Sequence, residues 1–202
     1  MTVPSSTSVR QVAALAWTCL ALALALAVTM NADTASQKTL FDFQAATNST
    51  AWQVVNDDVM GGVSTSKFQL LASGGAVFSG VVSMENNGGF ASVRSSPVRE
   101  ELSGCEVFVL RVRGDGRRYK FTVRTETGFN APIYQRAFTT KRNEWEEHRI
   151  AFKDFVPTFR GRVLTDVKPL NPAKVISVGF LISEQQAGPF RLEIGSVKAA
   201  AR

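Results

Sequence analysis

The feature that most constrains the fold is a series of short segments in which apolar and polar residues alternate, separated by Gly, Pro, Asn and Asp. A period of two residues is typical of strands with one buried face, and no stretch after residue 40 shows a helical period. Many short strands divided by turn residues predict an antiparallel sandwich or barrel. The segments that we expect to be strands are 40–43, 52–55, 67–72, 76–83, 90–94, 106–113, 118–125, 133–138, 145–152, 175–183 and 190–197.

The clearest alternation lies in 106–113 and 118–125, which are joined by the turn-forming sequence Gly-Asp-Gly-Arg at 114–117. Two alternating segments with such a short connection predict a hairpin. If the two strands pair, one face of the sheet carries four cations: Arg111, Arg113, Lys120 and Arg124. That face is either the solvated side of an antiparallel sheet or a basic surface that receives an acidic or polar partner.

The first 32 residues differ from the rest, because they contain no acidic residue, a single basic residue and an apolar run over 12–30. A short positive start, an apolar stretch and small residues are the layout of a secretory signal. The run is also nearly long enough to span a bilayer as an uncleaved anchor that tethers the protein. We therefore predict an exported protein, periplasmic or secreted. Residues 1–35 form a signal peptide or membrane anchor plus short linker, and 36–202 form one β-sandwich domain.

Cysteine and charge content narrow the classes of protein. Cys19 lies in the apolar run, so Cys105 is alone in the rest of the chain and is expected to be a buried structural thiol. A formal net charge of +6 favours acidic partners. No block of basic residues with interleaved aromatics is present, so we expect no nucleic-acid partner.

No sequence pattern predicts catalysis. The chain has one histidine, His148, and it lacks a nucleophile elbow, metal-ligand spacing and a phosphate-binding glycine loop. Glu144, Glu146 and Glu147 flank Trp145 and are expected to form a solvated strand edge, with a two-carboxylate glycosidase site as the alternative. We predict a protein that is not an enzyme, with no catalytic residue, no cofactor and no metal.

Two loops rich in Asn, Asp and Gly are candidates for a recognition edge. The first begins at an aromatic anchor, Trp52, and includes Asn56, Asp57, Asp58 and Met60. Short polar side chains favour turns, and the glycine pair at 61–62 allows a close approach of the backbone. A second glycine pair lies in 86–90, so we expect the two loops to converge at one end of the sandwich. The two aspartates either brace the turn or ligate a hard cation such as calcium.

The segment 155–162 is predicted to be an aromatic and basic loop. Its aromatic residues either cap an open end of the core, or Arg160 and Arg162 present paired guanidinium groups to a carboxylate or polar partner.

Several short motifs together resemble the CIA30 family, the domain of complex I intermediate-associated protein 30. The matching motifs are Trp52, 56–64, 78–80, 87–94, 110–117, Trp145, 159–162, 176–182 and 188–194, which follow one another over about 40–197. The resemblance implies a galactose-binding-like jelly-roll β-sandwich. It also implies a non-enzymatic role through protein–protein contacts, since mitochondrial members are similar to chaperones that assist the assembly of respiratory complex I.

The resemblance implies a mitochondrial location and partners among respiratory-complex subunits, whereas the N-terminal segment indicates export. An exported carbohydrate-binding module is the alternative function, suggested by the fold and by exposed-aromatic candidates in the loops. The candidate binding residues are Trp52, Asn56, Asp57, Asp58, Met60, Arg94, Arg111, Arg113, Trp145, Arg160 and Arg162.

Overall fold

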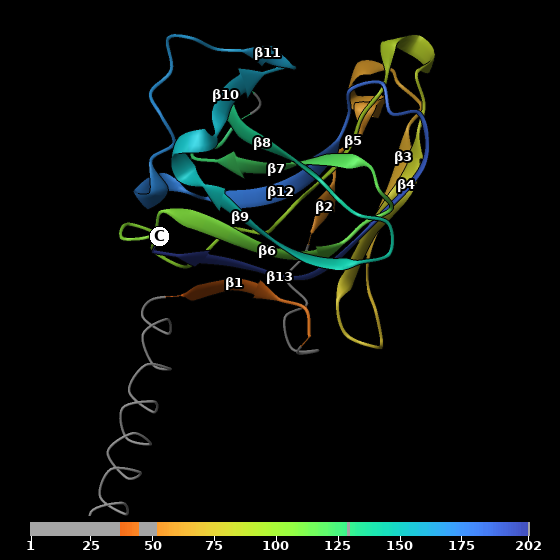
Figure 1. Ribbon diagram of the computed structural model, residues 1–202. Helices are drawn as coiled ribbons and strands as arrows, with labels where there is room; N and C mark the ends of the chain where they lie inside the picture. Colours follow the sequence, from red (N-terminus) through yellow and green to blue (C-terminus); the bar gives the residue numbers. More distant parts are fainter. Residues whose placement is uncertain (1–36, 45–51, 129, 202) are drawn as a thin grey trace, which may run out of the picture. The chain divides into compact units, whose positions relative to one another are not determined.

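The computed structural model describes residues 37–44, 52–128 and 130–201. These residues form two antiparallel β-sheets that pack face to face, which confirms the predicted all-β sandwich (Figure 1). The predicted signal or anchor segment, with its candidate tether at 12–30, lies outside the described residues. Within the described ranges, no helix is long and apolar enough to cross a membrane.

The first sheet has six strands and is organised around its longest member. Its order is β3-β4-β13-β6-β9, and β1 also pairs with β13. The strands are β1 (Lys38–Asp42), β3 (Thr65–Leu70), β4 (Ala76–Val82), β6 (Val107–Arg113), β9 (Trp145–Ala151) and β13 (Gly188–Ala200). β13 has 13 residues and pairs with β1, β4 and β6, so the last strand of the domain lies in the middle of this sheet.

The second sheet has seven strands in the order β11-β10-β8-β7-β12-β5-β2. The strands are β2 (Gln53–Val54), β5 (Ala91–Arg94), β7 (Arg118–Arg124), β8 (Ile133–Thr139), β10 (Val156–Phe159), β11 (Arg162–Val163) and β12 (Ser177–Ile182). Short 3-10 turns occur at η1 (Asp57–Met60), η2 (Glu85–Asn87), η3 (Phe152–Asp154) and η4 (Pro172–Lys174).

Every segment predicted to be a strand overlaps an observed one, but the predicted hairpin between 106–113 and 118–125 is wrong. β6 pairs with β13 and β9 in one sheet, whereas β7 pairs with β8 and β12 in the other. The connection at 114–117 therefore crosses between sheets, and the four cations do not share a face. The predicted loop at 155–162 instead forms the β10–β11 hairpin at the edge of the seven-stranded sheet.

Aromatic rings fill the space between the two sheets. Phe78, Phe108, Phe121 and Phe180 have no exposed surface, and they come from β4, β6, β7 and β12 of the two sheets. Trp52 is half-buried and packs on four phenylalanine rings, with centroid distances of 4.9 Å to Phe68, 5.1 Å to Phe41, 5.7 Å to Phe43 and 6.2 Å to Phe180. This packing gives Trp52 a place in the core, and a ligand-binding role for it stays a prediction.

Candidate functional site

The carboxylate of Asp57 joins the two glycine-rich loops. Its Oδ2 accepts hydrogen bonds from the Ser64 hydroxyl at 2.6 Å, the Gly89 amide at 2.7 Å and the Phe90 amide at 3.2 Å. Its Oδ1 accepts the Ser64 amide at 2.9 Å. The predicted convergence of the loops is therefore confirmed, and Asp57 has the bracing role that its turn-forming position indicated.

The environment of Asp57 favours its ionised form. The side chain has no exposed surface. Burial acts to raise the pKa of Asp57, but the hydrogen bonds from Ser64, Gly89 and Phe90 prevail and hold it below the ordinary value of 3.8. No group of three or more His, Cys, Asp or Glu side chains in the described part of the chain is placed to hold a metal ion.

The two braced loops expose apolar side chains. The exposed fraction is 54% for Val59, 60% for Met60, 46% for Val63 and 43% for Met84. Val59 and Met60 lie in η1, while Met84 precedes η2, and Figure 1 shows both turns at the same end of the sandwich beside β3, β4 and β5. We call these four side chains the loop patch.

Hydrogen bonds hold the backbone under the loop patch. The Ser83 amide donates to the Ser64 hydroxyl at 3.0 Å, which ties the residue after Val63 to the residue before Met84. Ser66 donates to the side chain of Asn56 at 2.7 Å, and Asn56 is only 9% exposed. Asp58 is exposed beside this network. Of the predicted residues after Trp52, Asn56 and Asp57 therefore hold the loop, whereas Asp58 and Met60 face solvent.

A second group of predicted residues meets on the outer face of the six-stranded sheet. Trp145 of β9 stands opposite Arg113 of β6, and its ring lies 5.1 Å from the Arg113 guanidinium carbon and 5.3 Å from that of Arg111. Guanidinium groups at this distance from an indole make favourable cation–π contacts. We call Trp145, Arg111 and Arg113 the Trp–Arg cluster.

Glu193 of β13 fixes one side of the Trp–Arg cluster. Its Oε2 accepts from Arg113 Nη2 at 2.6 Å and Nε at 3.2 Å, and its Oε1 accepts from Arg191 Nη2 at 3.0 Å and Nε at 3.1 Å. Glu193 is 7% exposed, so the carboxylate is held by two forked contacts in a largely dry position. Sequence reasoning missed Glu193, although Arg191 and Glu193 alternate with the buried Phe190, Leu192 and Ile194.

A cavity of about 350 Å³ adjoins the Trp–Arg cluster. Its lining brings together residues from β1, β6, β9 and β13 and the loop after β1: Asp42, Gln44, Val109, Arg111, Glu147, Gly195, Ser196 and Lys198. Apart from Arg111, and Glu147 in the alternative glycosidase site, sequence reasoning identified none of these as candidates. They meet because β13 lies between β1 and β6, a pairing that no local pattern reveals.

The remaining predicted residues lie elsewhere. Arg94 is on β5 of the seven-stranded sheet, where it donates to Gln53 at 2.9 Å. Arg160 lies in the turn between β10 and β11 with its guanidinium carbon 5.2 Å from the Phe159 ring, and Arg162 is exposed on β11. The predicted binding residues therefore form separate groups and not one site. Cys105 is buried as predicted, and burial raises the pKa of its thiol.

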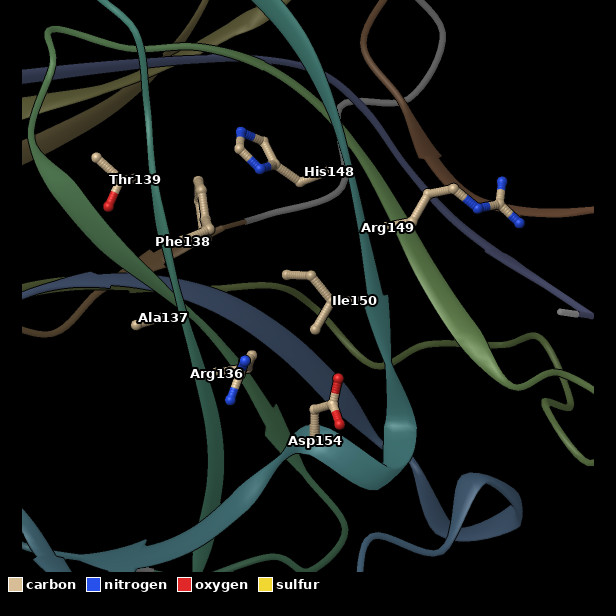
Figure 2. A pocket seen from close by; sticks show the side chains of 8 residues that line it. All are labelled: Arg136, Ala137, Phe138, Thr139, His148, Arg149, Ile150 and Asp154. Atoms are coloured by element: carbon tan, nitrogen blue, oxygen red, sulfur yellow. The ribbon is translucent and has the colours of Figure 1, made fainter.

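Another cavity, of about 300 Å³, opens between β8 and β9 (Figure 2). Figure 2 shows Phe138 and His148 at one end of it and Arg136 and Asp154 at the other. His148 is 4.9 Å from Phe138 by ring centroids, and its Nε2 is buried with no hydrogen-bond partner in the described part of the chain. The nearby carboxylate of Glu146, at 3.7 Å, accepts the Lys141 amide at 2.6 Å. His148 therefore lies on β9, the strand at one edge of the six-stranded sheet, against the ring of Phe138.

Comparison with known proteins identifies the family. A family model described as Complex I intermediate-associated protein 30 (CIA30) matches residues 41–194. The chain belongs to the CIA30 family. It is 29% identical over 180 residues to the mitochondrial Complex I intermediate-associated protein 30 of Drosophila melanogaster, covering 78% of this chain and 61% of that protein. With its mouse counterpart it shares 37% identity over 98 residues, covering 46% of this chain and 30% of that protein.

The match to this CIA30 protein therefore covers less than two thirds of the length of each of these two relatives. Its fold resembles that of a family 11 carbohydrate-binding module from Clostridium thermocellum, solved in complex with a β-1,3-1,4-mixed-linked tetrasaccharide. The TM-score is 0.62 at 15% identity, and the match covers 82% of this chain and 95% of the module. At this identity the likeness shows the two-sheet fold alone.

Proposed function

We propose that this CIA30 protein is a non-enzymatic assembly factor that holds a subunit or intermediate of respiratory complex I through protein–protein contacts. The observation that carries the proposal is the loop patch, in which four apolar side chains are exposed on loops that Asp57 makes rigid. The family supports the proposal, because its relatives are named for their association with a complex I intermediate.

The loop patch has the chemistry of a protein-binding surface. Several exposed apolar side chains on neighbouring loops are typical of interaction sites, whereas single exposed ones need no explanation. Methionine adapts to partner surfaces of different shape, and two of the four side chains, Met60 and Met84, are methionines. A loop held by buried hydrogen bonds also loses little conformational entropy on binding.

The finer fold assignment follows the same reasoning. The likeness to a carbohydrate-binding module and the family match support a galactose-binding-like jelly roll. The location stays a prediction: the expected export signal would place the protein in the periplasm or outside the cell, whereas the resemblance to mitochondrial family members implies the mitochondrion. A retained segment 12–30 would tether the domain at a membrane, next to membrane-complex subunits.

A carbohydrate-binding module is the second candidate, because the fold resembles one. Sugar rings pack on flat aromatic side chains, which combine a large apolar face with a polar edge. On the outer face of the seven-stranded sheet, the solvent-facing positions of β5, β7, β8 and β12 carry no aromatic residue. Of the tryptophans expected to bind sugar, Trp52 packs on core rings and Trp145 lies on the other sheet. We therefore rank this function below protein binding.

Co-purification tests the proposal. The tagged full-length chain is recovered from membranes of its own source, and complex I subunits are measured by mass spectrometry with Val59→Ser and Met60→Ser variants beside the wild type. We expect each variant to reduce recovery of complex I subunits about tenfold, since a buried apolar anchor contributes more than 1 kcal/mol at an interface. Val163→Ser is the matched control, because Val163 is 63% exposed on β11, outside the loop patch. Wild-type recovery of no complex I subunit, or an equal loss with the control, contradicts the proposal.

A further inference from the structure

The second predicted group, the Trp–Arg cluster, lies on a face that the loop patch does not include. A β-bulge in β13 shifts the register with β6 between Ile194 and Ser196, and Gly195 occupies the shifted position. A Cβ at Gly195 would lie 3.3 Å from Trp145 Cζ3 and 3.4 Å from Arg111 Cγ and Cδ. The indole and the aliphatic part of Arg111 therefore lie over Gly195, and the absence of a side chain there lets both pack close to the β13 backbone.

The carboxylates near the cavity have contacts of their own, and two of them, Asp42 and Glu147, also line it. Glu193 is held by Arg113 and Arg191 through the forked contacts described above. Glu147 lies 3.9 Å from Arg149, and Asp42 accepts the Gln44 amide at 2.9 Å. The face carries five cations, which are Arg111, Arg113, Arg149, Arg191 and Lys198, so positive charge is in excess.

Two of these cations lie at the cavity without an ion-pair partner. Among the described residues, neither Arg111 nor Lys198 has a carboxylate within ion-pair distance, and the contact of Lys198 is to the neutral Gln37 at 3.4 Å. Both line the cavity of about 350 Å³: Arg111 of β6 lies opposite Ser196 of β13, and Lys198 lies two residues further along β13. The Arg111 guanidinium is held by Trp145, so its donors are oriented before a ligand arrives.

We propose that this face binds an acidic segment of the partner protein, with a carboxylate seated in the cavity between Arg111 and Lys198 and the adjacent chain packed on Trp145. A guanidinium fork beside an ammonium group recognises a carboxylate by charge-assisted hydrogen bonds. Tryptophan and arginine are the residue types that dominate binding energy at protein interfaces. The inference rests on the proposed protein-binding function and adds a second surface and the chemistry of its partner.

A peptide titration tests it. The probe is a short fluorescein-labelled peptide of alternating Glu and Ser, and a Gln-Ser peptide of equal length is the neutral control; binding to the full-length protein is measured by fluorescence anisotropy. We expect the acidic peptide to bind and Arg111→Gln and Lys198→Gln each to weaken binding about tenfold, the value of one charge-assisted contact. Arg118→Gln removes the same charge from the other sheet, where the Arg118 side chain is 56% exposed, and is expected to change affinity less than about twofold.

Equal weakening by Arg118→Gln shows a general charge effect and overturns the proposal, as does equal binding of the Gln-Ser peptide or no binding at all. In the bound state, the NMR resonance of the Trp145 indole N–H is expected to shift. An unchanged resonance contradicts the proposed packing of the peptide on Trp145. Val59→Ser should leave peptide affinity unchanged. If the wild type recovers complex I subunits but does not bind the acidic peptide, this surface alone is rejected. If the wild type binds the peptide but recovers no complex I subunit, the proposed assembly function is rejected and the acidic-segment site is not.

Discussion

Asp57 offers the sharpest test of how the recognition loops are held. Asp57→Asn keeps the shape of the side chain but replaces one acceptor oxygen with an NH₂ group. Whichever way the amide turns, that group faces a backbone donor, either Ser64 or the Gly89–Phe90 pair. A buried donor without its acceptor costs about 1–3 kcal/mol, and the remaining hydrogen bonds lose the assistance of the charge. We expect the free energy of unfolding to fall by about 3 kcal/mol, which lowers the Tm by about 6–12 °C.

The same substitution has a predicted pH dependence. Because the pKa of Asp57 is lower in the folded protein than its ordinary value of 3.8, ionised Asp57 stabilises the fold at pH values above 3.8. That contribution is lost as the pH falls below 3.8 and through the folded pKa. The difference in stability between wild type and Asp57→Asn is therefore constant near neutral pH and narrows in acid.

Urea denaturation followed by tryptophan fluorescence measures both effects, because Trp52 is half-buried among phenylalanine rings and reports unfolding. The transition midpoint should shift while the slope stays constant. Asp58→Asn is the matched control: Asp58 is the next residue and is exposed, so its replacement should change stability by less than about 0.5 kcal/mol. Equal effects of the two variants, or a gap that widens in acid, would refute the reasoning.

Two further predictions concern the same loops and the buried thiol. Gly62→Ala should destabilise the protein by about 2 kcal/mol in urea denaturation, because its Cβ would lie 2.4 Å from Asp57 Cγ. Gly61→Ala should cost only about 1 kcal/mol, from its positive φ of 90°, since among the described residues no atom beyond its chain neighbours lies within 4 Å of that Cβ; equal costs would contradict the crowding argument. Cys105, which is 5% exposed and has a thiol pKa raised by burial, should react with a disulfide reagent at mildly alkaline pH more than about tenfold slower than in denaturant. A rate equal to that of the unfolded chain would show that the thiol is accessible.

The sequence predicts the local features of this fold well. Alternation locates strands that bury one face, and β7 shows this directly: Tyr119, Phe121 and Val123 are buried, while Lys120 and Thr122 between them are partly exposed. The convergence of the two glycine-rich loops could be predicted because both combine Asx residues with a glycine pair beside an aromatic. The detail that one carboxylate joins them could not, since Asp57 and Gly89 are distant in the sequence.

Pairing between distant strands is what the sequence does not show. The residues at 114–117 look like a hairpin turn, yet Gly114 forms a bridge with Arg142, and Asp115 accepts hydrogen bonds from Tyr119 and the Arg191 amide. β6 pairs with β13 on one edge and with β9 on the other, so neither edge is left for β7. For the same reason the three residues of the Trp–Arg cluster were predicted as candidates but their contact was not, and Glu193 and Lys198 were not predicted as candidates.

The central position of β13 also has a consequence during synthesis. The ribosome makes β13 after β1, β4 and β6, the three strands that pair with it. Until Gly188–Ala200 leaves the exit tunnel, β4 and β6 each have an edge without its native neighbour, and Phe78 and Leu110 lack the core contacts of that strand. Unpaired edges with apolar side chains are prone to aggregation and are what holding chaperones bind. A protein proposed to assist the assembly of others therefore passes through a stage of its own synthesis in which it needs such protection itself.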